Sequence, residues 1–336
     1  MKKIVFSTLN ILIAFFSYGV QFEILNNGAK NVAIGGGTSV FKDPMATLIN
    51  PANLSLEKSS LTLYYEASSS VNVGSLLELY NRRFIFNFGN VGISAKLDEF
   101  TRVSFLLSSY IYDLDVPEIT YRVLLFGISK KVLPFLLVGA SLGPVLGMNE
   151  NSVLLSFLAV AGTTLKLNDI LNASVVAKSP FSVNYINPYY GEISQTFPPI
   201  ISCGISFLVT KNTILSTATD IILVNNISAR ANNREIFTPR DDISDYILPR
   251  LGLVYYDEIS GYRIMFGFHR TQVEAISDSL HQYHLTSGVT FFIRIPGFRE
   301  FEINFCADDG ILLNLLNIAP QNVKKISLYV SGETRF

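Results

Sequence analysis

The sequence contains no tryptophan, two cysteines, three histidines and few charged residues. Charged side chains make up 16% of its 336 residues, whereas a typical soluble domain carries about 25%. This shortage argues against a salt-rich soluble surface, and the 49% of hydrophobic residues argue against intrinsic disorder. The 26 basic and 27 acidic residues give a net charge of −1, so no basic surface is available for nucleic acid. Cys203 and Cys306 are too few and too far apart for a disulfide scaffold or a zinc motif.

Long apolar runs of the kind that form membrane-spanning helices are also missing. Such a helix needs about 20 consecutive apolar residues. The best candidates are residues 132–148, which are interrupted by Pro134, Gly139 and Pro144, and the shorter stretch 153–165. The mean hydropathy is nevertheless +0.35. The composition therefore points to a membrane, without offering a helix that would cross it.

The first residues predict export. Lys2 and Lys3 precede an apolar stretch of about a dozen residues, and the small residues Ser17 and Gly19 follow it. This order is typical of a signal peptide over residues 1–19 that is cleaved after Gly19. The alternative is a short membrane anchor, but the apolar stretch is too short to span a bilayer with ease.

Most of the remaining chain alternates between apolar and small or polar residues. The clearest examples are Ile201–Thr210, Tyr262–His269, Leu285–Ile295, Phe301–Cys306 and Ile326–Phe336. A period of two is typical of β-strands with two different faces. A soluble β-sandwich would also alternate, but its polar faces are usually rich in Lys and Glu. Because Gly, Ser and Thr dominate here, we expect an all-β fold, a closed antiparallel transmembrane β-barrel of about 14 strands.

The expected strands can be placed along the chain. They start near Leu61, Phe84, Val91, Val103, Ile119, Pro134, Val153, Ala173, Ile200, Ile214, Tyr246, Tyr262, Leu285 and Phe301, and a terminal strand ends at Phe336. This terminal strand either adds to the count or replaces a weaker candidate. Lys211 and Asn212 form an expected two-residue turn, and 180–199 and 225–244 are expected long loops. The alternation puts Cys203 on the lipid face and Cys306 on the lumen face, so both thiols should be free.

Residues 28–54 carry the most specific motif, GAKNVAIGGGTSVFKDPMATLINPANL. Its fixed points are the glycines at 35–37, Asp43-Pro44, and Asn50-Pro51-Ala52 followed by Leu54. This block resembles the opening of the FadL/PorV superfamily of outer-membrane β-barrel proteins, apart from Gly37 where Ala is usual and Pro44 where Asp is commoner. Two further features resemble the PorV/PorQ-like branch. They are the chain length and the pair of segments LGLVYY at 251–256 and YRIMFGF at 262–268.

The resemblance implies a domain order and a set of site residues. Residues 20–60 would form an N-terminal plug and residues 61–336 a barrel in the outer membrane of a diderm bacterium, in contact with its lipid. The implied plug or ligand residues are Gly35, Gly36, Gly37, Asp43, Asn50, Pro51 and Ala52. The alternative for the Asn-Pro-Ala motif is a purely structural corner, since Asn-Pro starts turns. The terminal Phe336 resembles the signal that the barrel assembly machinery reads.

The resemblance also implies a function. The favoured one is a FadL-like channel for hydrophobic small molecules such as long-chain fatty acids. The alternatives are a PorV-like docking or shuttle subunit for secreted proteins and a purely structural barrel. The sequence does not separate these three.

Motifs that are typical of enzymes have simpler explanations in this sequence. Residues 139–143 match G-x-S-x-G, but Pro144 prevents the helix that a nucleophile elbow requires. His281 and His284 are expected to form a loop pair, and Asp308 is expected in a solvated turn. We therefore predict no enzyme, no metal site and no cofactor.

Overall fold

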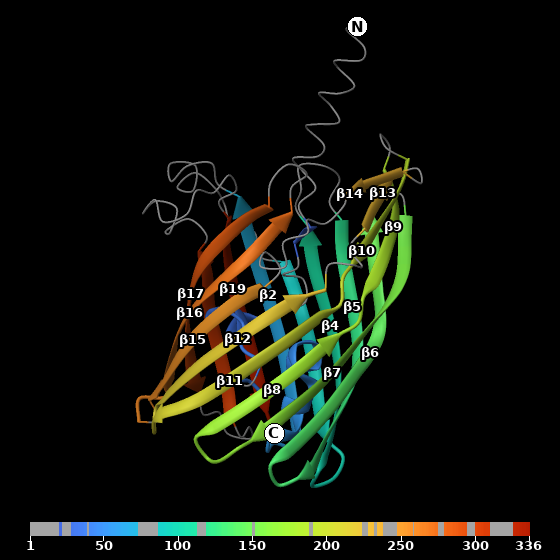
Figure 1. The fold of residues 1–336 in the computed structure, drawn as a ribbon. Coiled ribbons are helices and arrows are strands. Elements are labelled where there is room, and N and C mark those ends of the chain that lie inside the picture. The colour runs from blue at the N-terminus through green and yellow to red at the C-terminus, as the bar shows by residue number, and fades with distance from the viewer. Residues whose placement is uncertain are drawn as a thin grey trace, which may run out of the picture.

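The computed structural model describes most of the chain and places a β-barrel around a short helical segment (Figure 1). The described residues are 20–21, 28–38, 40–72, 87–112, 119–149, 152–187, 191–223, 228–231, 234–237, 247–257, 259–274, 279–293, 300–309 and 325–336. The predicted signal peptide, residues 1–19, lies outside them. Among the described residues, no helix is both long and apolar enough to cross a membrane.

Fourteen antiparallel strands build the barrel wall. They are β2 (Leu61–Asn72), β3 (Asn87–Lys96), β4 (Thr101–Tyr112), β5 (Ile119–Leu133), β6 (Leu136–Asn149), β7 (Ser152–Lys166), β8 (Leu171–Lys178), β11 (Ile200–Thr210), β12 (Thr213–Ile222), β15 (Ile247–Asp257), β16 (Tyr262–Glu274), β17 (Ser279–Ile293), β18 (Glu300–Asp309) and β19 (Lys325–Arg335). β19 pairs with β2, and β16 pairs with both β15 and β17, so the sheet closes on itself. Closure leaves no unpaired strand edge in lipid, and the predicted closed barrel is confirmed.

The two ends of the barrel differ. Adjacent strands are joined by short turns at one end, which we call the turn end, as at Lys211 and Asn212 between β11 and β12. The other end, the loop end, carries a small sheet of β9 (Phe181–Asn187), β10 (Gly191–Phe197), β13 (Ser228–Ala231) and β14 (Arg234–Phe237). A two-residue strand, β1 (Val20–Gln21), pairs with β16 at Val273 and Glu274.

Three of the sequence-based expectations need correction. Val91 lies inside β3, so no separate strand begins there; β19 supplies the fourteenth strand instead. The expected loop 180–199 contains the paired strands β9 and β10. The expected loop 225–244 contains β13 and β14. Both errors have the same cause, because these strands have only four to seven residues and pair in a separate sheet rather than in the barrel wall.

The two faces of the wall differ sharply in exposure. On β5, Leu125 is fully buried, whereas the next residue, Phe126, is 63% exposed. Exposed apolar side chains such as Leu142 and Phe157 continue this outer surface around the barrel. An apolar band of this kind is typical of a wall that faces lipid. The free thiols are also confirmed, with one cysteine exposed on the outer face and the other buried.

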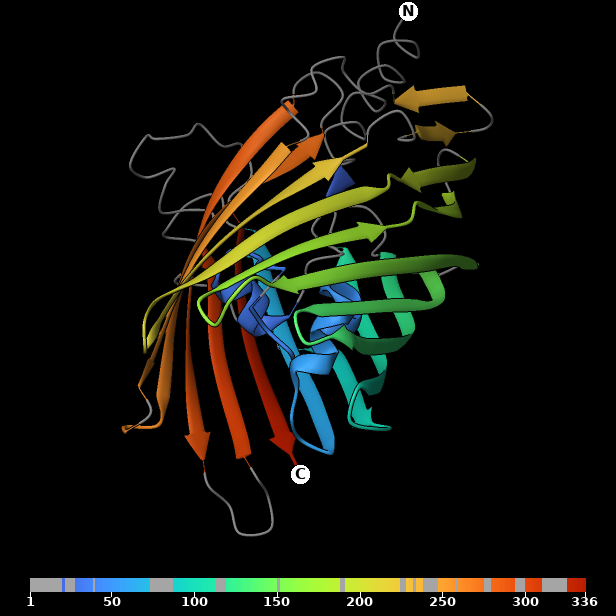
Figure 2. The same ribbon diagram turned by 60° about the horizontal axis from the view of Figure 1, so that its bottom comes forward.

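The N-terminal segment lies inside the barrel as three short helices (Figure 2). These are α2 (Ala29–Ala33), α3 (Ala46–Ile49) and η2 (Pro51–Leu56), a 3₁₀ helix. All residues of α2 and α3 are buried. We call the segment 28–60 the plug, without its undescribed residue 39.

Candidate functional site

The Asn-Pro-Ala motif starts a helix of the plug. Asn50 has extended backbone angles, and its side-chain Oδ1 accepts a hydrogen bond from the Ala52 amide at 3.2 Å. Pro51 occupies the first helical position, where its missing N–H costs no helical hydrogen bond. The local sequence therefore ends α3 and begins η2 within two residues.

The same motif fastens the plug to the wall at β5–β7. Asn50 Nδ2 donates to the Thr164 hydroxyl of β7 at 3.0 Å and to the Thr38 carbonyl at 2.7 Å. The Ala52 carbonyl accepts from the Ser129 hydroxyl of β5 at 2.9 Å. These contacts join three parts of the chain that are far apart in the sequence, so the motif both turns the chain and fastens the plug to the wall.

The glycine triplet passes against the opposite wall, at β15 and β16. Gly35 and Gly36 have φ angles of 68° and 91°, which disfavour residues with a side chain. A Cβ atom on Gly35 would lie 2.6 Å from the Phe268 carbonyl oxygen. Arg250 Nη1 donates to the Gly35 carbonyl at 2.9 Å, and its Nη2 lies 2.8 Å from Asp220. The glycines therefore allow the backbone to approach the wall closely enough to be held by Arg250.

A buried cluster of charges anchors α2 to β18 and β19. Lys30 Nζ lies 2.8 Å from Asp43 in the plug and 3.4 Å from Glu302 in β18, and it also contacts Glu333 in β19. The side chains of Lys30 and Asp43 are each 3% exposed, and those of both glutamates are fully buried. We call Lys30, Asp43, Glu302 and Glu333 the charged anchor. Because unpaired charges are costly in a buried environment, each member depends on the others.

Arg335 completes the charge balance around the anchor. Its guanidinium lies 2.7 Å from Glu333 and 2.6 Å from Glu302. Its Nε also lies 3.2 Å from Glu57, just after η2. Burial alone would lower the pKa of Lys30, but Asp43 and the two glutamates more than offset it and raise the pKa above its ordinary value. Lys30 is therefore held as a cation.

Glu57 gives this part of the plug a defined response to acid. Burial alone would raise its pKa, but Lys42, Arg335 and Ser59 outweigh burial and lower the pKa from 4.5 to about 2. Because its pKa is lower in the folded state, the ionised Glu57 stabilises the fold above pH 4.5, and this contribution is lost as the pH falls towards 2. We therefore expect the stability of the barrel to fall between these two pH values.

The measurement is the temperature at which the folded barrel is lost. This loss is detected as a change in the mobility of the protein on unheated gels. Glu57→Gln should remove part of the decrease between pH 4.5 and 2. Glu99→Gln, at an exposed turn position, is the matched control and should follow the wild type. An unchanged decrease in the Glu57 variant would contradict the assignment.

The lumen towards the loop end is apolar along one side. We call its buried, inward-facing side chains the apolar lumen patch; they are Tyr121, Val123, Val145, Leu158, Val160, Phe181 and Phe197. Phe181 and Phe197, from β9 and β10, stack with ring centroids 4.4 Å apart, and Tyr121 meets Phe197 edge-on at 5.8 Å. The patch is therefore shared between the barrel wall and the small sheet.

The plug or ligand residues predicted from the sequence are all buried inside the barrel, and their role towards a ligand stays a prediction. The residues that anchor the segment were missed. The missed residues are Lys30, Glu302, Glu333 and Arg335. Alternation placed both glutamates and Arg335 on the polar face of their strands, which was the available signal. The enzyme-like Ser141 lies in β6 and donates to the Thr47 carbonyl of the plug at 2.6 Å. The main chain of Phe336 pairs with Leu61 and Ser60, and its assembly role stays a prediction.

Two further expectations are wrong. His284 lies in β17 rather than in a loop, and Asp308 lies buried in β18 rather than in a solvated turn. The structure brings both next to His269 of β16. The spacing of these three residues in the sequence did not indicate the group, because its members come from three different strands.

These features define a class of protein, a closed 14-stranded barrel whose lumen holds an N-terminal plug. No family model and no curated protein matches the sequence. The chain is similar in structure to the CymD monoaromatic hydrocarbon channel, with a TM-score of 0.67 and 13% identity over 94% of this chain and 99% of that one. It is similar to the Ralstonia pickettii toluene transporter TbuX, also at 0.67 and 13%, over 94% and 100%. A Pseudomonas aeruginosa FadL homologue aligns at 0.61 and 11%, over 93% and 99%.

At identities this low, the similarity in structure shows a shared fold and nothing more. The PorV branch of the sequence resemblance finds no support among these structures.

Proposed function

We propose that this protein is an outer-membrane channel for hydrophobic small molecules, closed at rest by its plug. The observation that carries the proposal is the apolar lumen patch. A channel for polar solutes has a polar, water-filled interior, whereas one side of this interior is packed with apolar side chains such as Leu158 and Val160, which are at most 1% exposed. An apolar interior of this kind suits a solute that prefers an apolar environment to water.

The fold and the outer surface support the same conclusion. CymD is a monoaromatic hydrocarbon channel and TbuX a toluene transporter, so their fold accommodates hydrophobic solutes. The apolar outer wall and the predicted signal peptide support an outer-membrane location. Long-chain fatty acids and monoaromatic hydrocarbons are the two candidate solute classes. The docking role for secreted proteins stays a prediction from the sequence.

The experiment is extraction of the full-length protein from native membranes in mild detergent, followed by mass spectrometry of what co-purifies. We expect a hydrophobic small molecule in near-stoichiometric amount. Leu158→Asn should release it, because a buried amide in the patch disfavours an apolar ligand. Ser156→Asn, on the same face of the same strand, exchanges one polar side chain for another and should retain it.

Two outcomes would contradict the proposal. An empty wild-type barrel that co-purifies with a secreted protein would favour the docking role. Equal retention of the small molecule by the Leu158 and Ser156 variants would place the ligand outside the apolar lumen patch. Both variants must first show the gel mobility of a folded barrel.

A further inference from the structure

Three potential metal ligands meet on the lumen wall, apart from the charged anchor and the apolar lumen patch. His269, His284 and Asp308 come from the adjacent strands β16, β17 and β18, and they are 4%, 2% and 7% exposed. The two histidines are direct partners in the strand register, and their rings stack with centroids 4.7 Å apart. Pairing of three neighbouring strands therefore fixes the group.

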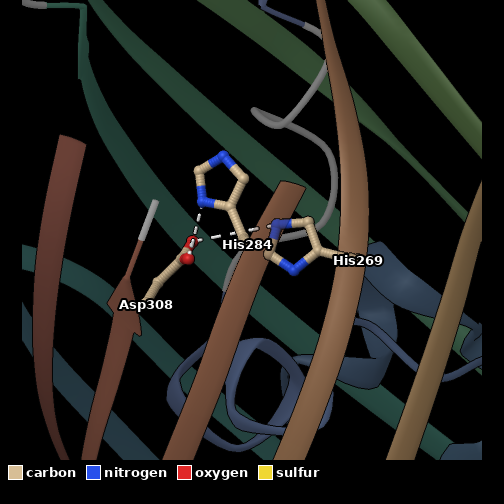
Figure 3. A group of neighbouring side chains, drawn as sticks. All are labelled: His269, His284 and Asp308. Atoms are coloured by element: carbon tan, nitrogen blue, oxygen red, sulfur yellow. Dashed lines mark hydrogen bonds and ion pairs between the residues drawn. The ribbon is translucent and has the colours of Figure 1, made fainter. Parts of the chain in front are cut away.

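The carboxylate of Asp308 reaches both rings (Figure 3). One of its oxygens lies 2.8 Å from His284 Nδ1, and the other lies 3.9 Å from His269 Nε2. One ligand atom from each of the three residues lies within 4.8 Å of the others. Around a tetrahedral zinc ion, ligand atoms lie about 3.3–3.5 Å apart, as follows from bonds of 2.0–2.2 Å. Small side-chain rotations would bring the three donors to that spacing.

The donor set has a clear chemical preference. Two imidazole nitrogens and one carboxylate oxygen are ligands of zinc and of related divalent transition metals. Three protein ligands leave a fourth tetrahedral position for water or another donor. Magnesium and calcium prefer oxygen ligands alone and do not suit two imidazoles.

We propose that His269, His284 and Asp308 bind one divalent transition-metal cation of the zinc type. The site lies directly beside the plug. Thr286, two residues after His284 on the same face, donates its hydroxyl to the Ala33 carbonyl of α2 at 3.1 Å. Gly267, two residues before His269, lies against the Gly35 backbone. A bound cation would link β16, β17 and β18 where they meet the plug and would stabilise that part of the wall.

The test uses the full-length barrel in detergent, stripped with a chelator and dialysed. Zinc chloride is then titrated by calorimetry, and retained zinc is counted by elemental mass spectrometry. We expect one zinc per chain and a higher unfolding temperature, because a ligand that binds only the folded state stabilises it. His284→Gln and Asp308→Asn should weaken binding by about tenfold or more, since even changes behind the ligands have effects of that size.

His281→Ala is the matched control, since it removes the remaining histidine of the chain and should leave zinc binding unchanged. The proposal is overturned if the wild type binds no zinc, if both ligand variants bind it as the wild type does, or if only His281→Ala abolishes binding. If one ligand variant does not form the barrel, the wild-type stoichiometry and the other variant decide. The outcome is independent of the channel function, because binding is measured without a solute.

Discussion

Lys30→Met is expected to release the plug and convert a closed barrel into an open pore. The substitution keeps a long side chain but removes the cation that Asp43 shares with the two glutamates of the anchor, which then have Arg335 as their remaining buried partner. Breaking a buried ion pair in this way costs about 3–5 kcal/mol. The wall should remain folded, because its strands are joined by a closed set of backbone hydrogen bonds. Most of the cost therefore falls on the contact between plug and wall.

The measurement is ion conductance in planar lipid bilayers. Wild-type barrels should stay closed, and the Lys30 variant should give frequent, pore-sized openings. Lys42→Met is the matched control, because Lys42 is 39% exposed and its ion pair with Glu57 is 3.9 Å long. It should remain closed. A Lys30 variant that stays as closed as the wild type would show that the charged anchor does not hold the plug.

Gly139→Ala is expected to displace the other side of the plug. A Cβ atom on Gly139 would overlap the Ala52 amide nitrogen and would lie 2.6 Å from the Pro51 carbonyl oxygen. These are backbone atoms, which cannot rotate away as the end of a side chain can. Overpacking of this kind costs about 1–3 kcal/mol, so η2 should move away from β6.

The displacement can be measured by labelling Ala52→Cys with a water-soluble thiol reagent. Ala52 is fully buried in the seated plug, so labelling should be slow in the single variant and much faster when Gly139→Ala is added. Gly89→Ala in β3 is the matched control, since its Cβ would meet nothing closer than the Ser68 hydroxyl at 3.3 Å. Equal labelling rates in all three proteins would contradict the close packing of η2 on β6.

The fold was largely predictable because lipid-facing and lumen-facing residues alternate along nearly every strand of a transmembrane barrel. The alternation placed Cys203 outside and Cys306 inside, and the structure confirms both. It failed for β9 and β10, which have seven residues each and pair in a separate sheet rather than in the barrel wall.

The site was less predictable because its parts are brought together by pairing between distant strands. Lys30 and Glu333 are 303 residues apart in the sequence. Alternation shows that Glu333 faces the lumen. It does not show which part of the plug lies at the same level as Glu333 along the barrel axis. The same limit hid the group of His284 and Asp308, whose proximity depends on the register between β17 and β18.

The claim that this barrel carries hydrophobic molecules is tested most directly by solute uptake. Cells that lack other channels of this kind would be compared with and without the protein, using labelled toluene, labelled oleate and a labelled polar sugar of similar size. We expect the protein to increase uptake of at least one hydrophobic solute and to leave uptake of the sugar unchanged. Unchanged uptake of both hydrophobic solutes, with the protein folded in the outer membrane, would contradict the proposed function.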